Sequence, residues 1–152
     1  MAHKLLILVH LVGFAAYLGA GFAQQQLVAR SAEGGLVAAV RDNYEKLAAA
    51  IVTKIEVPAI ALQLVTGVTF LVLSPAWLQF GWMHGKLTCV AGLLALSHAE
   101  MFNARKIVAA RAARGDAAGE EIAARKKRHA LFGSIGSLFA VALLVLVAYG
   151  LG

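Results

Sequence analysis

Four long apolar stretches constrain the fold of this chain more than any other feature. A helix that crosses a lipid bilayer needs about 20 mostly apolar residues, and four stretches meet that need: residues 5–23, 57–73, 80–102 and 130–151. Only 14% of the residues are charged, against about 25% in soluble domains. The sequence therefore predicts an all-α protein with one integral membrane domain, residues 1–152, built as a four-helix bundle with helical cytoplasmic extensions.

The connections between these stretches differ in charge, which predicts the orientation of the chain. The second connection is short and contains Pro75, Trp77 and Gly81, as expected for a turn at a membrane surface. The other two, residues 24–56 and 103–129, hold twelve of the 14 basic residues. Because basic residues favour the cytoplasmic side, we expect both connections to be cytoplasmic and both termini to lie outside.

The two basic connections are expected to extend the helices rather than to form loops. Apolar residues recur every three or four positions, with Glu45 off their stripe: Leu36, Val40, Tyr44, Leu47, Ile51 and Ile55. This pattern predicts that the second span begins early, in the cytoplasm, and kinks at Pro58. Residues 104–128 are expected to continue the third span, turn at Gly115–Asp116 and return. The basic run Arg125–Arg128 is interpreted as facing lipid headgroups, with no nucleic-acid partner.

Ionisable side chains in and beside the spans are the candidate functional residues, because such groups are costly in a membrane. His10 lies one or two turns inside the first span, and His84 and Lys86 lie at a similar depth in the third. His84 and Lys86 are about 200° apart around their helix, so only one of them can face the bundle interior. His98 shares a helix face with His84 and is paired with His129 near the cytoplasm, although an interfacial position is favoured for His129.

Several chemistries suit this set of nitrogen donors. Histidines on facing helices can bind haem iron, and buried histidines can also relay protons or bind copper or zinc. A buried lysine can bind iron when neutral or pair with a haem propionate. Structural roles are the alternative: a hydrogen bond to a backbone carbonyl for His10, and extension toward the membrane surface for Lys86. The convergence of His10 with His84 and Lys86 favours a functional site.

A motif in the third stretch resembles a known family. The segment Gly81–Leu87, GWMHGKL, follows Pro58, Thr66-Gly67 and Pro75, precedes His98, and is similar to the GW-x-H-x-KL pattern of the HemJ-type membrane protoporphyrinogen IX oxidases. The segment His10–Gly13 resembles the start of that family's first span. The resemblance implies a four-span, haem b-binding, oligomeric protein of a bacterial cytoplasmic (inner) membrane. It also implies that His10 and Lys86 serve haem binding and activity.

Three departures separate the chain from that family. Tyr17 stands in place of a tryptophan, Gln24–Gln26 in place of an arginine, and Leu131–Ser134 in place of an Asn-Glu-x-Pro segment. These positions are where substrate or proton handling would be expected, so the resemblance supports haem binding more than porphyrinogen oxidation.

The resulting expectation is a b-type haem protein that transfers electrons. His10 is the expected axial ligand, and Lys86 or His84 is the second ligand or a partner of a propionate, with Lys86 as the candidate catalytic residue. One haem b per chain is favoured over two, the second site being His98 with His129. A porphyrin is a candidate substrate, a quinone or another acceptor would take the electrons, and a homodimer fits the small-residue spacings. The alternatives are a haem carrier, a gas or redox sensor and, with least support, a copper-handling protein.

Overall fold

The computed structural model describes residues 1–150, and within that range the regular structure is entirely helical. Five helices account for most of it: α1 (Ala2–Arg30), α2 (Ala38–Ile51), α3 (Val57–Leu73), α4 (Gly81–Arg114) and α5 (Gly119–Gly150). Three short elements join them: the π turn η1 (Val52–Glu56) and the 3₁₀ turns η2 (Pro75–Gln79) and η3 (Gly115–Ala118). The predicted all-α class is confirmed for the described residues.

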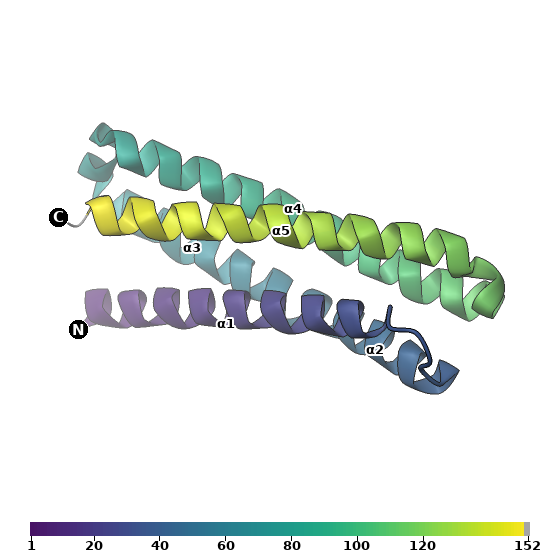
Figure 1. The fold of residues 1–152 in the computed structure, drawn as a ribbon. Helices are drawn as coiled ribbons and strands as arrows, with labels where there is room; N and C mark the ends of the chain where they lie inside the picture. The colour runs from purple at the N-terminus through teal and green to yellow at the C-terminus, as the bar shows by residue number, and fades with distance from the viewer. Residues whose placement is uncertain (151–152) are drawn as a thin grey trace.

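The helices are long and apolar enough for a membrane protein. By length and composition, three continuous helical stretches could cross a bilayer: Ala2–Arg30, Ala38–Leu73 and Gly81–Gly150. The third doubles back at η3, so that α4 and α5 lie antiparallel and side by side (Figure 1). The start of α1 and the end of α5 lie at the same end of the molecule, opposite the α1–α2 loop and η3 (Figure 1).

The predicted turns lie where the sequence places them. Residues 75–79 form η2 between α3 and α4. The helix α4 ends at Arg114, and the next residue, Gly115, has a positive φ of 55°, which suits a residue without a Cβ. Next to Pro58, where the sequence predicts a kink, the helix contains the π turn η1, which ends two residues earlier at Glu56. Pro58 has no N–H to donate to the carbonyl of Lys54, so the regular hydrogen-bond pattern is already interrupted at this point.

The polarity of the molecule is the reverse of that of a soluble protein. Large apolar side chains such as Leu47 and Ile55 are exposed, whereas Glu45 and Glu56 are at most 3% exposed. The apolar stripe of residues 36–55 therefore predicts the helix correctly, but the face of α2 and η1 that packs inward carries Glu45, Ala48, Val52 and Glu56. Along the four apolar stretches, exposed side chains such as Val65 and Leu138 would be stable in lipid, where burial of apolar groups gives no advantage over exposure.

An apolar core holds four of the helices together. Tyr17 of α1, Ile60 of α3, Leu93 of α4 and Leu143 of α5 belong to one buried cluster. Gly92 lets α4 approach α5 closely at this level, since a Cβ there would lie 3.0 Å from Phe139 Cζ. A second, smaller apolar cluster lies beside η3 and consists of Ile107, Ala110, Ala118 and Ile122.

The close approach at Gly92 yields a prediction. We expect Gly92→Leu to lower the free energy of unfolding by about 1–3 kcal/mol, because the Phe139 ring blocks the added side chain. Gly19→Leu is the matched control, since a Cβ on Gly19 has no atom within 4 Å. Thermal unfolding of the purified protein in detergent would measure both. Equal melting temperatures for the two variants would contradict this packing.

Candidate functional site

His10 is held by α3 in a defined orientation. Its Nδ1 atom lies 2.6 Å from Thr66 Oγ1, and the Thr66 hydroxyl donates to the Leu62 carbonyl oxygen over 2.7 Å. Because the hydroxyl proton is already used, Thr66 accepts from His10, which places the imidazole proton on Nδ1. The Gln63 amide also donates to the His10 carbonyl, and Phe70 packs edge-on against the ring at 5.7 Å. The Nε2 lone pair is left with no hydrogen bond from the described residues.

Lys86 and His84 separate as the helix geometry requires. Lys86 of α4 is half-buried and lies within electrostatic range of His10. His84 is exposed, and its Nε2 donates to the Leu78 carbonyl oxygen of η2 at 2.9 Å. Of the two, Lys86 is therefore the residue that accompanies His10.

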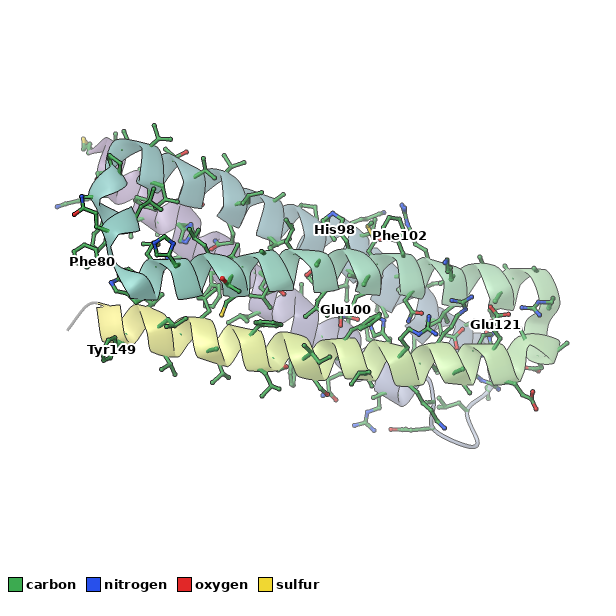
Figure 2. The ribbon with its side chains drawn as sticks, turned by 90° about the horizontal axis from the view of Figure 1, so that it is seen from above. Phe80, His98, Glu100, Phe102, Glu121 and Tyr149 are labelled. Atoms are coloured by element: carbon green, nitrogen blue, oxygen red, sulfur yellow. The ribbon has the colours of Figure 1, made fainter. Side chains whose placement is uncertain are left out.

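His98 and His129 have different surroundings. His98 is half-buried and its Nδ1 donates to the Leu94 carbonyl oxygen of its own helix at 2.8 Å. His98 projects from one side of α4 and Glu100 from the other, toward α5 (Figure 2). His129 is completely buried and is hydrogen-bonded to Gln24 and Asn103. His129 therefore faces the inside of the molecule, where its ring satisfies polar groups of α1 and α4.

A buried polar cluster around Glu100 was not predicted from the sequence. Gln24 and Gln25 of α1 donate from their amides to the two carboxyl oxygens of Glu100, at 3.3 and 2.5 Å. Asn103 can only donate from Nδ2 to His129 Nδ1, so His129 carries its proton on Nε2 and donates it to Gln24 Oε1. The glutamine side chains and His129 thus fix the position of Glu100.

Glu56 completes this cluster from the end of η1. It is 1% exposed and lies beside Ser97, Glu100 and Gln24. Its Oε2 atom has no hydrogen-bond partner among the described residues. Ser97 in turn donates to the Tyr17 hydroxyl at 3.3 Å. A sequence signal was present: Glu56 immediately precedes the second apolar stretch and Glu100 lies inside the third.

A groove of about 1,210 Å³ lies mainly between α1 and α5 and reaches this cluster. Its lining runs from the α1–α2 loop, residues 33–36, to Tyr17 and Leu144. Glu56 and Glu100 both line it, and no histidine does. The groove is large enough for a small molecule, but it is separate from His10 and Lys86.

A second buried cluster, the Glu45 ion cluster, ties α2 to α4 and α5. Arg111 donates from Nη2 and Nε to the two oxygens of Glu45 at 3.0 and 3.1 Å, and Lys126 Nζ lies 2.7 Å from Glu45 Oε1. Arg111 also pairs with Asp42 and Asp116. Lys126 is only 8% exposed, so the expectation that the whole run Arg125–Arg128 faces lipid headgroups is wrong for this residue.

The Glu45 ion cluster lies outside the four apolar stretches, and the pKa values of Glu45 and Lys126 in it are shifted from their ordinary values. Burial would raise the pKa of Glu45, but the hydrogen bonds from Arg111 and Lys126, aided by their charges, hold that pKa below its ordinary value of 4.5. For Lys126, burial outweighs the hydrogen bond that it donates to Glu45, so the pKa of this amine is lowered. The pKa of Glu45 falls in spite of burial because two cations, Arg111 and Lys126, pair with this one carboxylate.

The lowered pKa of Glu45 predicts a dependence of stability on pH. The cluster contributes its full stability above pH 4.5, the ordinary pKa of the group, and loses it as the pH falls through the lower pKa of the folded state. We therefore expect the difference in melting temperature between the wild type and Glu45→Gln to be constant near neutral pH and to shrink below pH 4.5. A difference that stays unchanged in acid would contradict the arrangement.

The described residues contain no group of three or more His, Cys, Asp or Glu side chains placed to hold a metal ion. Haem iron needs only one or two protein ligands, so this finding bears on copper or zinc rather than on haem. No family model, curated protein or solved structure matches the chain.

Proposed function

We propose that the chain is a membrane-embedded b-type haem protein that transfers electrons, with His10 as the axial ligand of the iron. The observation that carries this proposal is the hydrogen bond between His10 and Thr66. Histidines that bind metals almost always donate their other ring N–H to a fixed acceptor, which orients the ring and makes the ligating nitrogen more basic. His10 has this arrangement, with Nε2 available.

Four membrane crossings accompany this proposal. The four apolar stretches, the exposed apolar surface and the position of the start of α1 and the end of α5 at one end of the molecule support them. The basic connections lie at the other end, which the positive-inside rule assigns to the cytoplasm of a bacterial cell. His10 and Lys86 would then lie in the outer half of the membrane.

Lys86 is the second residue of the proposed site. It is half-buried and near His10, where it would pair with a haem propionate or serve as the second iron ligand. His84 is less suited, because its Nε2 is engaged by the Leu78 carbonyl. The haem would supply one-electron redox chemistry, while the chain would provide ligation, orientation and an apolar surrounding. A porphyrinogen is the proposed electron donor and a quinone the proposed acceptor.

An absorption spectrum of the detergent-purified protein tests this function. We expect a reduced-minus-oxidised spectrum of the b type with one haem per chain, lost in His10→Ala and retained in the control His84→Ala. Thr66→Val should weaken haem retention by about 10–100-fold, the usual effect of removing such a supporting hydrogen bond. Lys86→Ala should lower haem content or shift the midpoint potential.

Three other outcomes would redirect the proposal. A colourless protein, even after expression with added haem, would overturn haem binding. Two haems per chain, with one lost in His98→Ala, would establish the second site formed with His129. Rapid binding of carbon monoxide, without reduction by a porphyrinogen or oxidation by a quinone, would indicate a haem carrier or gas sensor. Copper in the purified protein, lost in His10→Ala, would indicate a copper-handling protein.

A further inference from the structure

Two carboxyl side chains, Glu56 and Glu100, form a buried pair in the groove. They are 1% and 5% exposed and lie against each other. None of the ion pairs formed by residues 1–150 includes either of them. Lys126, which also lines the groove, is already paired with Glu45. The pair therefore has no counter-charge from the described part of the chain.

Two adjacent carboxylates cannot both be ionised at low cost in such a place. Burial disfavours each charge, and the two like charges repel each other. Carboxyl pairs in this situation share one proton. The hydrogen bonds decide which member is charged: Glu100 accepts from the amides of Gln24 and Gln25, as a carboxylate requires.

Glu56 has the environment of a neutral acid. Its Oε2 atom is buried without a hydrogen-bond donor, and an unsatisfied oxygen costs much less on a neutral carboxyl group than on a carboxylate. Oε2 faces Gly21 of α1, where a Cβ would lie 3.8 Å away. Because Gly21 also lines the groove, this oxygen faces the side from which a proton can arrive.

We propose that Glu56 and Glu100 form a proton-binding site that holds one proton at neutral pH and exchanges it through the groove. The groove leads from the α1–α2 loop to the pair, so the proton enters from the end of the molecule that carries the basic connections. The site is independent of haem, since no histidine lines the groove.

Two other titratable side chains, Tyr17 and His129, lie near the pair, and neither supplies a counter-charge to Glu56 or Glu100. Tyr17 of α1 accepts a hydrogen bond from Ser97, which lies beside Glu56. His129 of α5 is connected to Glu100 through hydrogen bonds to Gln24. The sequence of α3 contains no titratable residue. His129 accepts a hydrogen bond from Asn103 on one ring nitrogen and donates one to Gln24 from the other, so its imidazole ring is neutral in this arrangement. Within residues 1–150, neither carboxyl group forms an ion pair with a cation.

Infrared difference spectroscopy of the detergent-purified full chain tests the site, because a protonated carboxyl group has its own C=O stretching band. An isolated glutamate is ionised at neutral pH, with a pKa of about 4.3. We expect one carboxylic acid band at neutral pH that shifts in D₂O and disappears on going to alkaline pH. The band should be lost in Glu56→Gln. In Glu100→Gln it should disappear at a lower pH than in the wild type, because the neighbouring like charge is gone. It should persist in Glu33→Gln, the matched control, which removes an exposed carboxylate from the outer part of the groove.

The contrary results are equally specific. A wild-type protein without the band would overturn the proposal, and so would a band that survives in Glu56→Gln or one whose pH dependence is the same in Glu100→Gln as in the wild type. Spectra recorded in sodium chloride and in choline chloride separate a proton from a metal cation. A band that appears only when choline replaces sodium would show that the pair binds Na⁺ instead. Glutamine has nearly the shape of glutamate, and the thermal unfolding of each variant would verify that it is folded.

Discussion

Replacing Glu45 by alanine is expected to lower the free energy of unfolding by about 3–5 kcal/mol, the usual cost of removing one member of a buried ion pair. Glu45 is 3% exposed and accepts hydrogen bonds from both Arg111 and Lys126. Without it, Lys126 keeps only the carbonyl oxygen of Ser31. Arg111 keeps the two aspartates, Asp42 and Asp116, which are more exposed than Glu45.

The effect should extend to the arrangement of the helices. Glu45 lies on α2, Arg111 on α4 and Lys126 on α5, so one carboxylate joins three elements at the end of the molecule opposite the chain ends. We expect α2 of the variant to exchange its amide hydrogens faster than α2 of the wild type, measured by hydrogen–deuterium exchange. Breaking this one cluster therefore loosens the packing of a whole helix.

Glu33→Ala is the matched control for this prediction. Glu33 pairs with Arg30 at 3.1 Å on the surface, where both side chains are more than half exposed. Such pairs contribute about 0–1 kcal/mol, so the control should unfold close to the wild type. If Glu45→Ala also lost less than about 1 kcal/mol, the Glu45 ion cluster would not hold the helices together.

The sequence predicted the helices and turns of this chain because those depend on local patterns. Each apolar stretch, the turn at Pro75 and the turn at Gly115 is marked by residues that are consecutive in the sequence. The inward face of α2 was not predicted, because the apolar stripe of residues 36–55 does not by itself show which side of the helix packs against the other helices. For α2 the stripe of Leu47 and Ile55 points outward, and Glu45 points inward.

The candidate site was predicted only in part, for a related reason. The position of His10 follows from its place in the first apolar stretch, but Thr66, which orients it, is 56 residues away. Gln24 and His129 are separated by 105 residues, and no local pattern links them. Pairings over such distances are set by how the helices pack, which a single sequence does not specify.

The second large effect is expected for His129→Ala, which should lower the free energy of unfolding by about 3–5 kcal/mol. The His129 side chain is completely buried, so its removal leaves a cavity. The substitution also leaves Gln24 Oε1 without its donor, and an unsatisfied buried polar group costs about 1–3 kcal/mol. Urea or thermal unfolding in detergent would measure the loss, with the exposed His84→Ala as control.

A double-mutant cycle separates the hydrogen bond from the cavity. Gln24→Leu removes the acceptor of His129 Nε2 and one of the two amide donors to Glu100. If the hydrogen bond matters, the two single losses will sum to more than the loss of the double variant, by about 0.5–3 kcal/mol. Additive losses would mean that His129 acts through its volume alone. Glu100 would then depend on Gln25 for its orientation, and the buried polar cluster would divide into two independent parts.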